Sequence, residues 1–387
     1  MFSMTGAPQT STDSPQGQAR SAPAPTAWPP GPTGPWQGPV RVGLVGGSGY
    51  AGLELLRLLL CHPRVQVAWV QSRSHAGQTV PSRYPSLVGL CELTYTGASP
   101  AELADQADVV FFATSPGQAA EQAPGVLEAG CAVIDLSPDF RLRDARRYPE
   151  VYGWVHPAPE WLARAAYGIP ELFGAQLAAT RLVANPGCYP TAVLLAVAPL
   201  VRAGLVDWSE PLTVFATSGI SGAGSQPQAG YHFPEAAENV RPYGLPRHRH
   251  APEMEQELVR LAGEGQDVRV VFIPHLVPAS RGLLATCVVR PARPCTQAEL
   301  VELYREHYRQ DFFVRVMAPP ALPQTKAVYG SNFCDVTVRV EPRAGQVVAM
   351  AALDNLVKGA AGQALQNLNR MAGWDERLGL EFAPVYP

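Results

Sequence analysis

The fold is decided by one stretch, Val40-Arg41-Val42-Gly43-Leu44-Val45-Gly46-Gly47-Ser48-Gly49-Tyr50-Ala51-Gly52, which leads into the leucine-rich residues 53–60. Its first six residues predict a β-strand, and residues 53–60 predict a helix. The glycines between them fit both G-x-G-x-x-G and G-x-x-G-x-x-G. Such a turn lets the backbone approach a pyrophosphate, which the free N–H groups of the helix N-terminus can bind. An ordinary tight turn is the alternative, but the context favours a dinucleotide site at Gly46, Ser48, Gly49, Tyr50, Ala51 and Gly52.

Strands and helices alternate beyond this turn. Strands are predicted at residues 65–70, 107–114, 131–136 and 182–184, and helical stretches at residues 102–107 and 118–129. This alternation is typical of a doubly wound parallel sheet. Such sheets bind ligands at the carboxyl ends of their strands, so the glycine turn, Ser115, Arg141 and Cys188 are expected along one edge.

The second strand ends in Gln71-Ser72-Arg73-Ser74. An NAD site usually has an acidic residue here for the ribose 2′-hydroxyl, and this segment has none. Ser72 and Arg73 instead suit a 2′-phosphate, so NADP is the predicted cofactor; a solvated surface arginine is the alternative.

Two later turns are also expected at the cofactor. The first is Ser115-Pro116-Gly117, which follows a strand. The second is Ser218-Gly219-Ile220-Ser221-Gly222-Ala223-Gly224, whose N–H groups and hydroxyls could hold an anion or form a flexible connector. Ser115, Pro116, Ser221 and Gly222 are therefore candidate cofactor residues.

The candidate nucleophile lies in Asn185-Pro186-Gly187-Cys188-Tyr189-Pro190-Thr191. This segment joins a predicted strand to an apolar helix over residues 192–200. Its prolines stiffen the elbow, and Gly187 permits a sharp turn. A thiol at a helix N-terminus is expected to have a lowered pKa and to favour the thiolate. A buried structural cysteine is the alternative.

Histidines open a later helical stretch, Arg247-His248-Arg249-His250-Ala251-Pro252-Glu253. An H-x-H pair can bind a metal, but no third ligand stands at a recognisable spacing, so no metal is predicted. Histidine at this place can be a general acid/base or a satisfied surface residue.

The second half of the chain has a different pattern. Strands are predicted at residues 212–217, 268–273, 283–289, 333–340 and 347–352, beside one helix at residues 297–309. Residues 355–371 show helical spacing. The predicted fold class is therefore α/β: a Rossmann-type parallel sheet domain, then an α+β domain with a mixed, largely antiparallel sheet.

Composition limits the classes of function. The 387 residues suffice for two domains, and the net charge of −3 gives no reason to expect nucleic acid or a membrane surface as a partner. Seven scattered cysteines without a C-x-x-C pair argue against a disulfide framework and indicate a reducing cytoplasm. Residues 1–39 are rich in Pro, Gly, Ser, Thr and Gln and predict a disordered tail without a signal peptide.

A dinucleotide fold, an elbow cysteine and a distant histidine together suit acyl chemistry. A thiolate can attack an activated carbonyl to give a thioester, which hydride reduces to an aldehyde. An acyl phosphate is a suitable substrate because phosphate leaves readily and the anion-binding loops could hold it.

The sequence closely resembles the N-acetyl-gamma-glutamyl-phosphate reductases of arginine biosynthesis. The resemblance extends from Val40 to the end and includes the glycine turn, the cysteine elbow and several further segments. These are Asp135-Leu136-Ser137-Pro138-Asp139-Phe140-Arg141, Ser218–Gly224, His232-Phe233-Pro234-Glu235, His248–Glu253, Gly330-Ser331-Asn332-Phe333-Cys334-Asp335 and Asp354–Gln363, which includes Asp354-Asn355-Leu356-Val357-Lys358-Gly359.

The resemblance implies a fold like that of aspartate semialdehyde dehydrogenase. It implies an NADP-binding domain at residues 40–187, completed by the C-terminal helix at residues 355–387, and a catalytic and oligomerisation domain at residues 188–354, in a homo-dimer or homo-tetramer. Cys188 matches the nucleophile, His250 the acid/base with His248 assisting, and Asn355 the segment near the nicotinamide. Arg141, Asn185 and Glu253 are assigned to the substrate. Ser225 departs from the pattern, because many members carry Arg or Lys there.

Other readings remain open at this point. The carrier-protein-linked aminoadipyl-phosphate reductases of lysine biosynthesis resemble the same span, but their cysteine segment departs from the one present here. An aspartyl-phosphate substrate is a third reading. A noncatalytic NADP-sensing or scaffold protein is a reading from another class, and the intact Cys188 and His250 argue against it.

Overall fold

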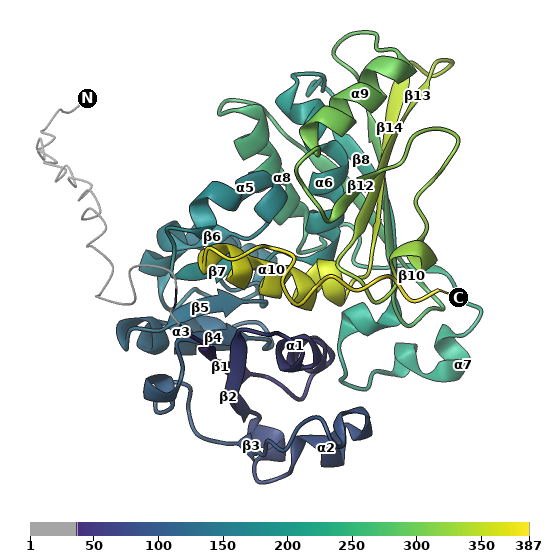
Figure 1. Cartoon of the computed structure of the whole chain (residues 1–387). Helices are drawn as coiled ribbons and strands as arrows, with labels where there is room; N and C mark the ends of the chain where they lie inside the picture. The colour runs from purple at the N-terminus through teal and green to yellow at the C-terminus, as the bar shows by residue number, and fades with distance from the viewer. Residues whose placement is uncertain (1–35, 37, 387) are drawn as a thin grey trace, which may run out of the picture.

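The computed structural model describes Trp36 and residues 38–386. These residues form two seven-stranded sheets, one above the other in Figure 1, with helices packed on both. The predicted disordered tail at residues 1–39 lies almost wholly outside the described residues.

The first sheet is parallel throughout and has the strand order β3-β2-β1-β4-β5-β7-β6. This confirms the predicted Rossmann-type sheet. Its strands are β1 (Val40–Val45), β2 (Val65–Gln71), β3 (Tyr95–Thr96), β4 (Val109–Phe112), β5 (Ala132–Asp135), β6 (Ala166–Tyr167) and β7 (Leu182–Ala184). Neighbouring residues point to opposite faces: Phe111 joins one buried cluster and Phe112 another. Both faces are thus covered, which explains why the strands are apolar runs.

Helices α1 (Tyr50–Leu60) and α3 (Gln118–Glu128) pack on opposite faces of this sheet. Shorter helices follow at α2 (Val80–Arg83), α4 (Tyr148–Tyr152) and α5 (Pro170–Leu177). The helix predicted at residues 102–107 is wrong in type, since only a single 3₁₀ turn, Ala104–Gln106, forms there. Strand β4 begins three residues later, which leaves too little chain to nucleate an α-helix.

The second sheet is mixed and has the order β12-β13-β14-β11-β8-β10-β9. Four of its six pairings are antiparallel, as predicted; β8 with β10 and β12 with β13 are parallel. Its strands are β8 (Leu212–Gly219), β9 (Arg241–Pro242), β10 (Val270–Val277), β11 (Leu283–Val289), β12 (Val314–Val316), β13 (Cys334–Glu341) and β14 (Gln346–Leu353).

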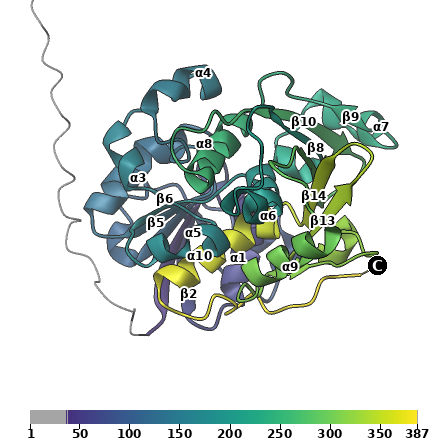
Figure 2. The same cartoon turned by 90° about the horizontal axis from the view of Figure 1, so that it is seen from above.

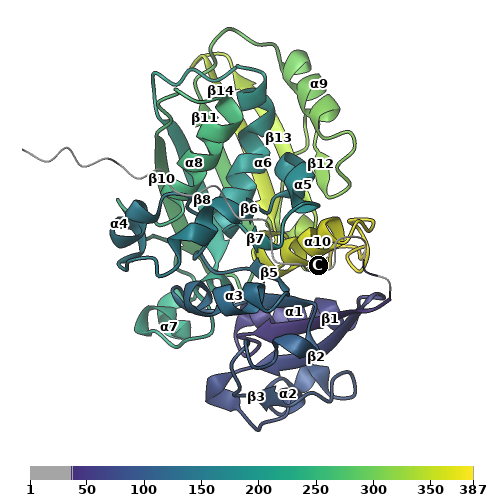
Figure 3. The same cartoon turned by 90° about the vertical axis from the view of Figure 1, so that its left-hand side faces the viewer.

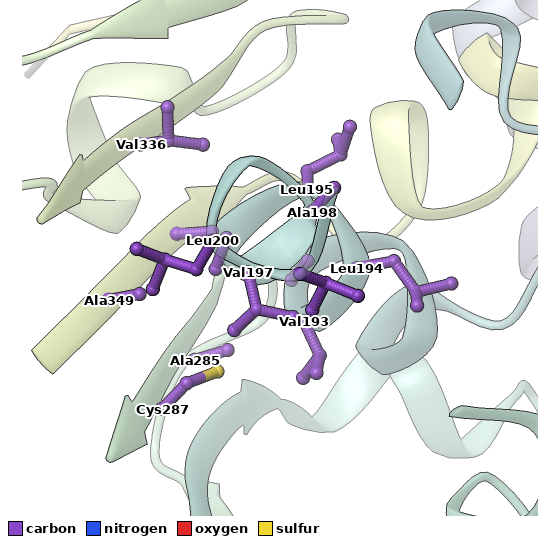
Figure 4. Close-up of a cluster of buried hydrophobic side chains, with 14 of the residues drawn as sticks. Val193, Leu194, Leu195, Val197, Ala198, Leu200, Ala285, Cys287, Val336 and Ala349 are labelled. Atoms are coloured by element: carbon purple, nitrogen blue, oxygen red, sulfur yellow. The ribbon is translucent and has the colours of Figure 1, made fainter. Parts of the chain in front are cut away.

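More than one helix covers the second sheet, so that part of the prediction was incomplete. Helices α6 (Cys188–Arg202), α8 (Ala251–Ala262) and α9 (Gln297–His307) lie on the same side of it (Figure 2). The short α7 (Phe233–Ala236) lies apart from them. Helix α6 is at the centre of this core, and Figure 4 shows Val193, Val197 and Leu200 packed toward Ala285 and Ala349 of the sheet. The helix that begins at Cys188 is therefore held by its apolar face.

The C-terminal segment returns to the first sheet. It begins with a π-helical turn, Val357–Ala361, and continues as α10 (Gly362–Met371), beside α1 in Figure 3. The sequence predicted one regular helix from residue 355, and the extension of that helix to residue 387 is wrong, since α10 ends at Met371. Asp354 instead accepts hydrogen bonds from the N–H groups of Leu356 and Val357, so its carboxylate caps the segment and the helical turns begin after it.

No helix within residues 38–386 combines the length and the apolar composition needed to cross a membrane.

Candidate active site

A cavity of about 460 Å³ opens at the carboxyl edge of the first sheet. Eight of the predicted cofactor residues line it: Gly46, Ser48, Gly49, Tyr50, Ala51, Ser72, Arg73 and Ser115. Gly46 has a φ of 80°, which favours glycine. Gly52 and Pro116 are not among the lining residues. A Cβ on Gly52 would lie 2.3 Å from the carbonyl oxygen of Gly46, so Gly52 lets α1 pack against the turn.

The ribose end of this cavity is polar and cationic. The hydroxyls of Ser48 and Ser72 are 2.8 Å apart, and Arg73 donates to the amide oxygen of Gln122 at 3.5 Å. None of the described residues that line the cavity is acidic. Arg83 and His75 also line it, and sequence reasoning missed both. Arg83 lies beyond the second strand, in a segment without clear periodicity, so only the fold brings it here.

A second cavity, of about 840 Å³, lies beside the first, and Tyr50 and Ser225 line both. Ser221 lines the second cavity, and its hydroxyl accepts a hydrogen bond of 3.0 Å from the side chain of Asn355. The carbonyl oxygen of that side chain accepts from the N–H of Gly282 at 2.8 Å. Gly222 lies nearby: a Cβ there would be 3.7 Å from Nδ2 of Asn355. The structure thus brings together the three predicted residues Ser221, Gly222 and Asn355.

The candidate nucleophile, Cys188, is the first residue of α6 and is half-buried. His250 reaches the same elbow from the start of α8, because a Cβ on Gly187 would lie only 2.6 Å from Nε2 of His250. Glycine is therefore required at 187 for the imidazole to approach. The other ring nitrogen, Nδ1, has no hydrogen-bond partner among the described residues. The ring of His248 lies 4.9 Å from that of His250.

The protonation states differ from the sequence expectation. Burial raises the pKa of Cys188 to about 11, although the nearby charges of Arg141 and Arg249 oppose this rise. The predicted lowering of the thiol pKa is therefore wrong, because burial of the thiol outweighs the helix N-terminus. Burial also lowers the pKa of His250 well below its usual value, helped by His248 and the two arginines. At neutral pH Cys188 is therefore a thiol and His250 a neutral imidazole.

A buried ion pair supports the elbow. One carboxylate oxygen of Glu253 accepts from the N–H of Gly187 at 2.9 Å and from the hydroxyl of Tyr167 at 2.7 Å; the other lies 3.4 Å from Nη1 of Arg141. Arg141 also donates to the carbonyl oxygens of Asn185, at 2.9 Å, and Leu136, at 2.7 Å. The guanidinium is thus fixed beside Gly187, where a Cβ would be 3.0 Å from Nη1.

Two of the residues assigned to substrate are fully buried: Asn185 and Glu253. The side chain of Asn185 donates to the carbonyl oxygen of Ala360 at 3.1 Å and accepts from Asn367 at 2.9 Å. Both oxygens of Glu253 face protein partners. These contacts favour positioning roles for both residues. Arg141 is 7% exposed and its guanidinium likewise contacts protein groups, so it offers a substrate its positive charge beside the elbow.

Among the described residues, no three His, Cys, Asp or Glu side chains gather as a possible metal site.

The buried histidines predict a pH dependence of stability. Burial, with a smaller contribution from Arg249, lowers the pKa of His248 to about 4, against about 6.5 in an unfolded chain. Between these values the unfolded state binds a proton that the folded state does not, so the free energy of unfolding falls as pH falls from about 6.5 to about 4. The slope is at most about 1.4 kcal/mol per pH unit for one group.

Urea unfolding at pH 7.5 and pH 5 measures this effect. His248→Asn should show a smaller loss of stability between the two pH values than the unmutated chain. Equal losses in the two proteins would contradict the lowered pKa.

Comparisons with known proteins place this geometry in a class. Residues 41–180 match the family model described as semialdehyde dehydrogenase, NAD binding domain, and residues 188–355 match the one described as semialdehyde dehydrogenase, dimerisation domain. A solved aspartate semialdehyde dehydrogenase with NADP from Candida albicans superposes with a TM-score of 0.65 at 17% identity, over 87% of this chain and 99% of that one. An aspartate semialdehyde dehydrogenase II from Vibrio cholerae gives 0.64 at 18% identity, over 86% of this chain and 98% of that one. These two likenesses show the fold.

Sequence relatives identify the family within this class. An N-acetyl-gamma-glutamyl-phosphate reductase of Desulforudis audaxviator is 47% identical over 348 residues, which is 90% of this chain and 100% of the relative. The protein of the same name from Halorhodospira halophila is 48% identical over 349 residues, with the same two coverages. The chain belongs to the N-acetyl-gamma-glutamyl-phosphate reductase family.

Proposed function

We propose that this chain catalyses the NADPH-dependent reduction of N-acetyl-gamma-glutamyl phosphate to N-acetylglutamate 5-semialdehyde, with release of phosphate, in arginine biosynthesis. The observation that carries the proposal is the close approach of His250 to Gly187, the residue that precedes Cys188 in the chain. This pair stands at the edge of a dinucleotide-binding sheet in a chain of this family.

The protonation states define the first step. Neutral His250 accepts the proton of Cys188 as the sulfur attacks the acyl carbon, since a thiol with a pKa of about 11 is mostly protonated at neutral pH. The carbon–sulfur bond forms, the bond from carbon to the phosphate oxygen breaks, and phosphate leaves. Arg141, fixed beside the elbow, stabilises the negative charge that develops at sulfur.

The second step completes the reduction. The glycine turn, the cavity along it and its cationic end fit a dinucleotide, which when bound supplies hydride to the thioester carbon. His250, protonated in the first step, returns the proton to the oxygen that becomes negative. Cleavage of the thiohemiacetal then gives the aldehyde and regenerates the thiol.

NADP is proposed over NAD because two arginines, Arg73 and Arg83, line the cavity without an acidic neighbour in its lining. Arg73→Ala should therefore weaken NADPH binding much more than NADH binding. A charge-assisted contact is worth about 1.5–3 kcal/mol, so the NADPH/NADH preference should fall by roughly tenfold or more.

Fluorescence titration with the two reduced cofactors measures this preference. Arg64→Ala is a matched control, since Arg64 contacts the ring of Trp374 and does not line the cavity. An unchanged NADPH/NADH ratio in Arg73→Ala would remove Arg73 from the 2′-phosphate site.

The two sheets are proposed to have different roles. We assign residues 40–187 with 355–387 to cofactor binding, and residues 188–354 to catalysis and self-association as a homo-dimer or homo-tetramer in the cytoplasm. The outer face of the second sheet exposes Phe215 and Val271, which supports association through that face. Light scattering on the purified full chain distinguishes the two assemblies.

The function is tested by following NADPH consumption with N-acetyl-gamma-glutamyl phosphate, or NADP reduction by N-acetylglutamate 5-semialdehyde plus phosphate. Carrier-linked aminoadipyl phosphate is the comparison substrate. Faster turnover of the N-acetylglutamyl compound is expected. Faster turnover of the aminoadipyl compound would reassign the substrate, and inactivity with both would refute the proposed reaction.

A further inference from the structure

The chain uses lysine almost nowhere. Only two of its 30 cationic Lys and Arg side chains are lysines, Lys326 and Lys358. Lys326 is exposed, whereas Lys358 is fully buried. A buried ammonium is costly unless it is paired and hydrogen-bonded, so its environment needs an explanation.

Lys358 is held by a buried polar cluster. Its Nζ lies 2.6 Å from Oε1 of Glu171 and 2.7 Å from Oε1 of Gln366. Gln366 in turn donates to Glu171 at 3.0 Å and accepts from Asn332 at 3.0 Å. Burial alone would raise the pKa of Glu171, but the charge and hydrogen bond of Lys358 hold it below its usual value. The cluster is therefore a charged pair that joins α5 to the C-terminal segment.

The residue after Lys358 touches the nucleophile. A Cβ on Gly359 would lie 2.7 Å from the Cβ of Cys188, so this backbone rests directly against the cysteine. Two further contacts fix the same turn around the elbow: Asn185 donates to the carbonyl oxygen of Ala360 at 3.1 Å, and Gln363 donates to the hydroxyl of Thr191 at 3.1 Å. The turn is π-helical, a geometry that is rare and frequent at functional sites.

We infer that Lys358 is a positioning residue: through its pair with Glu171 it holds the π-helical turn against Cys188. This contact keeps the thiol in the position from which it can attack the acyl carbon and transfer its proton to His250. This inference rests on the proposed function for its kinetic consequences. Lys358 acts by geometry, because the charges that act most on Cys188 are those of Arg141, Arg249 and Glu253.

The small buried space at position 358 explains why the cation there is a lysine. A compact ammonium fits between the two acceptors in a fully buried site, whereas a planar guanidinium needs more room and a forked arrangement of acceptors. Lys358→Arg is therefore expected to behave as a disruptive change, although it keeps the charge.

The first experiment compares Lys358→Met with the unmutated enzyme under conditions where both are folded. A small misplacement of reacting groups costs about 10²-fold, so kcat should fall by that order while the dissociation constant for NADPH stays within about twofold. Labelling of Cys188 by iodoacetamide, followed on its own peptide, should become about fivefold faster, because displacing Gly359 uncovers one side of the half-buried thiol.

The second experiment separates positioning from stability. Lys358→Met leaves Glu171 unpaired, whereas Lys358→Met with Glu171→Gln removes both charges and should regain much of the Tm. The double variant should still have the low kcat and the fast labelling. If the single variant does not fold, the double variant alone is used to measure kcat and the labelling rate.

A matched control is Arg315→Met, which removes the partner of Asp335, an acid on β13 with an exposed fraction of only 2%. Its kcat and labelling rate should match those of the unmutated chain. Recovery of kcat together with Tm in the double variant, or a kcat in Lys358→Met like that of the control, would overturn the inference. Inactivity of the unmutated enzyme would refute the proposed function instead, and the labelling rates would still decide the role of Lys358.

Discussion

Cys188→Ala is expected to lose activity by at least ~10³-fold in kcat, because no other group can form the thioester. Binding of NADPH should stay near normal, since Cys188 does not line the cavity along the glycine turn. Turnover and cofactor titration on the same preparation measure both quantities. Trapping acyl-enzyme with labelled substrate should give a covalent adduct in the unmutated chain and none in the variant.

The serine variant tests whether the thiol itself is required. Cys188→Ser keeps the size of the side chain but replaces the thiol by an alcohol that is far less ionised at neutral pH, so it should also be nearly inactive. Cys295→Ala is the matched control, because Cys295 is also half-buried but lies just before α9. Substantial turnover by Cys188→Ala would refute covalent catalysis at this elbow.

His250→Asn is expected to slow turnover by about 10²–10⁴-fold, the usual contribution of general acid–base catalysis. The protein should still bind NADPH. Because the pKa of His250 lies well below its usual value, the imidazole of the free enzyme stays neutral over a wide range. In the unmutated chain, the loss of kcat/KM on the acid side of the pH profile should therefore begin only well below pH 6.5. In His250→Asn this loss should be absent.

His248→Asn is the matched comparison. Its ring packs against His250, and its ring nitrogen accepts from the N–H of residue 250 at 3.1 Å, so it supports the active ring and should cost less. A larger loss in His248→Asn than in His250→Asn would exchange the two roles. If neither variant changes the rate, the proton is transferred by another group.

The local patterns of the sequence predicted most of the architecture. The glycine turn, the alternating strands and the cysteine elbow each depend on residues adjacent in the chain, and the structure has a strand, turn and helix at those places. The long strands of the second sheet were also predicted, because their apolar runs are long enough to show. The shortest strands, such as β3 and β9, were missed, since two residues carry no periodicity.

The properties that sequence could not predict depend on distant segments. The raised pKa of Cys188 comes from burial in the assembled fold, which no local pattern reports. Arg83 enters the cofactor cavity only because α2 folds back beside the turn. Lys358 and Glu171 lie 187 positions apart, so their pairing exists only once the C-terminal segment has docked.

The return of the C-terminal segment has a consequence for biosynthesis of the protein. Val357, Leu365 and Leu368 belong to the same buried cluster as Val42 and Leu44 of the first strand. A ribosome makes these strand residues long before the helix, and domains generally fold as they are completed. The buried cluster of the first sheet therefore stays incomplete until residues 357–368 have been made. Because Gly359 arrives in the same segment, the nucleophile and the nucleotide fold become competent together, and a nascent chain has neither.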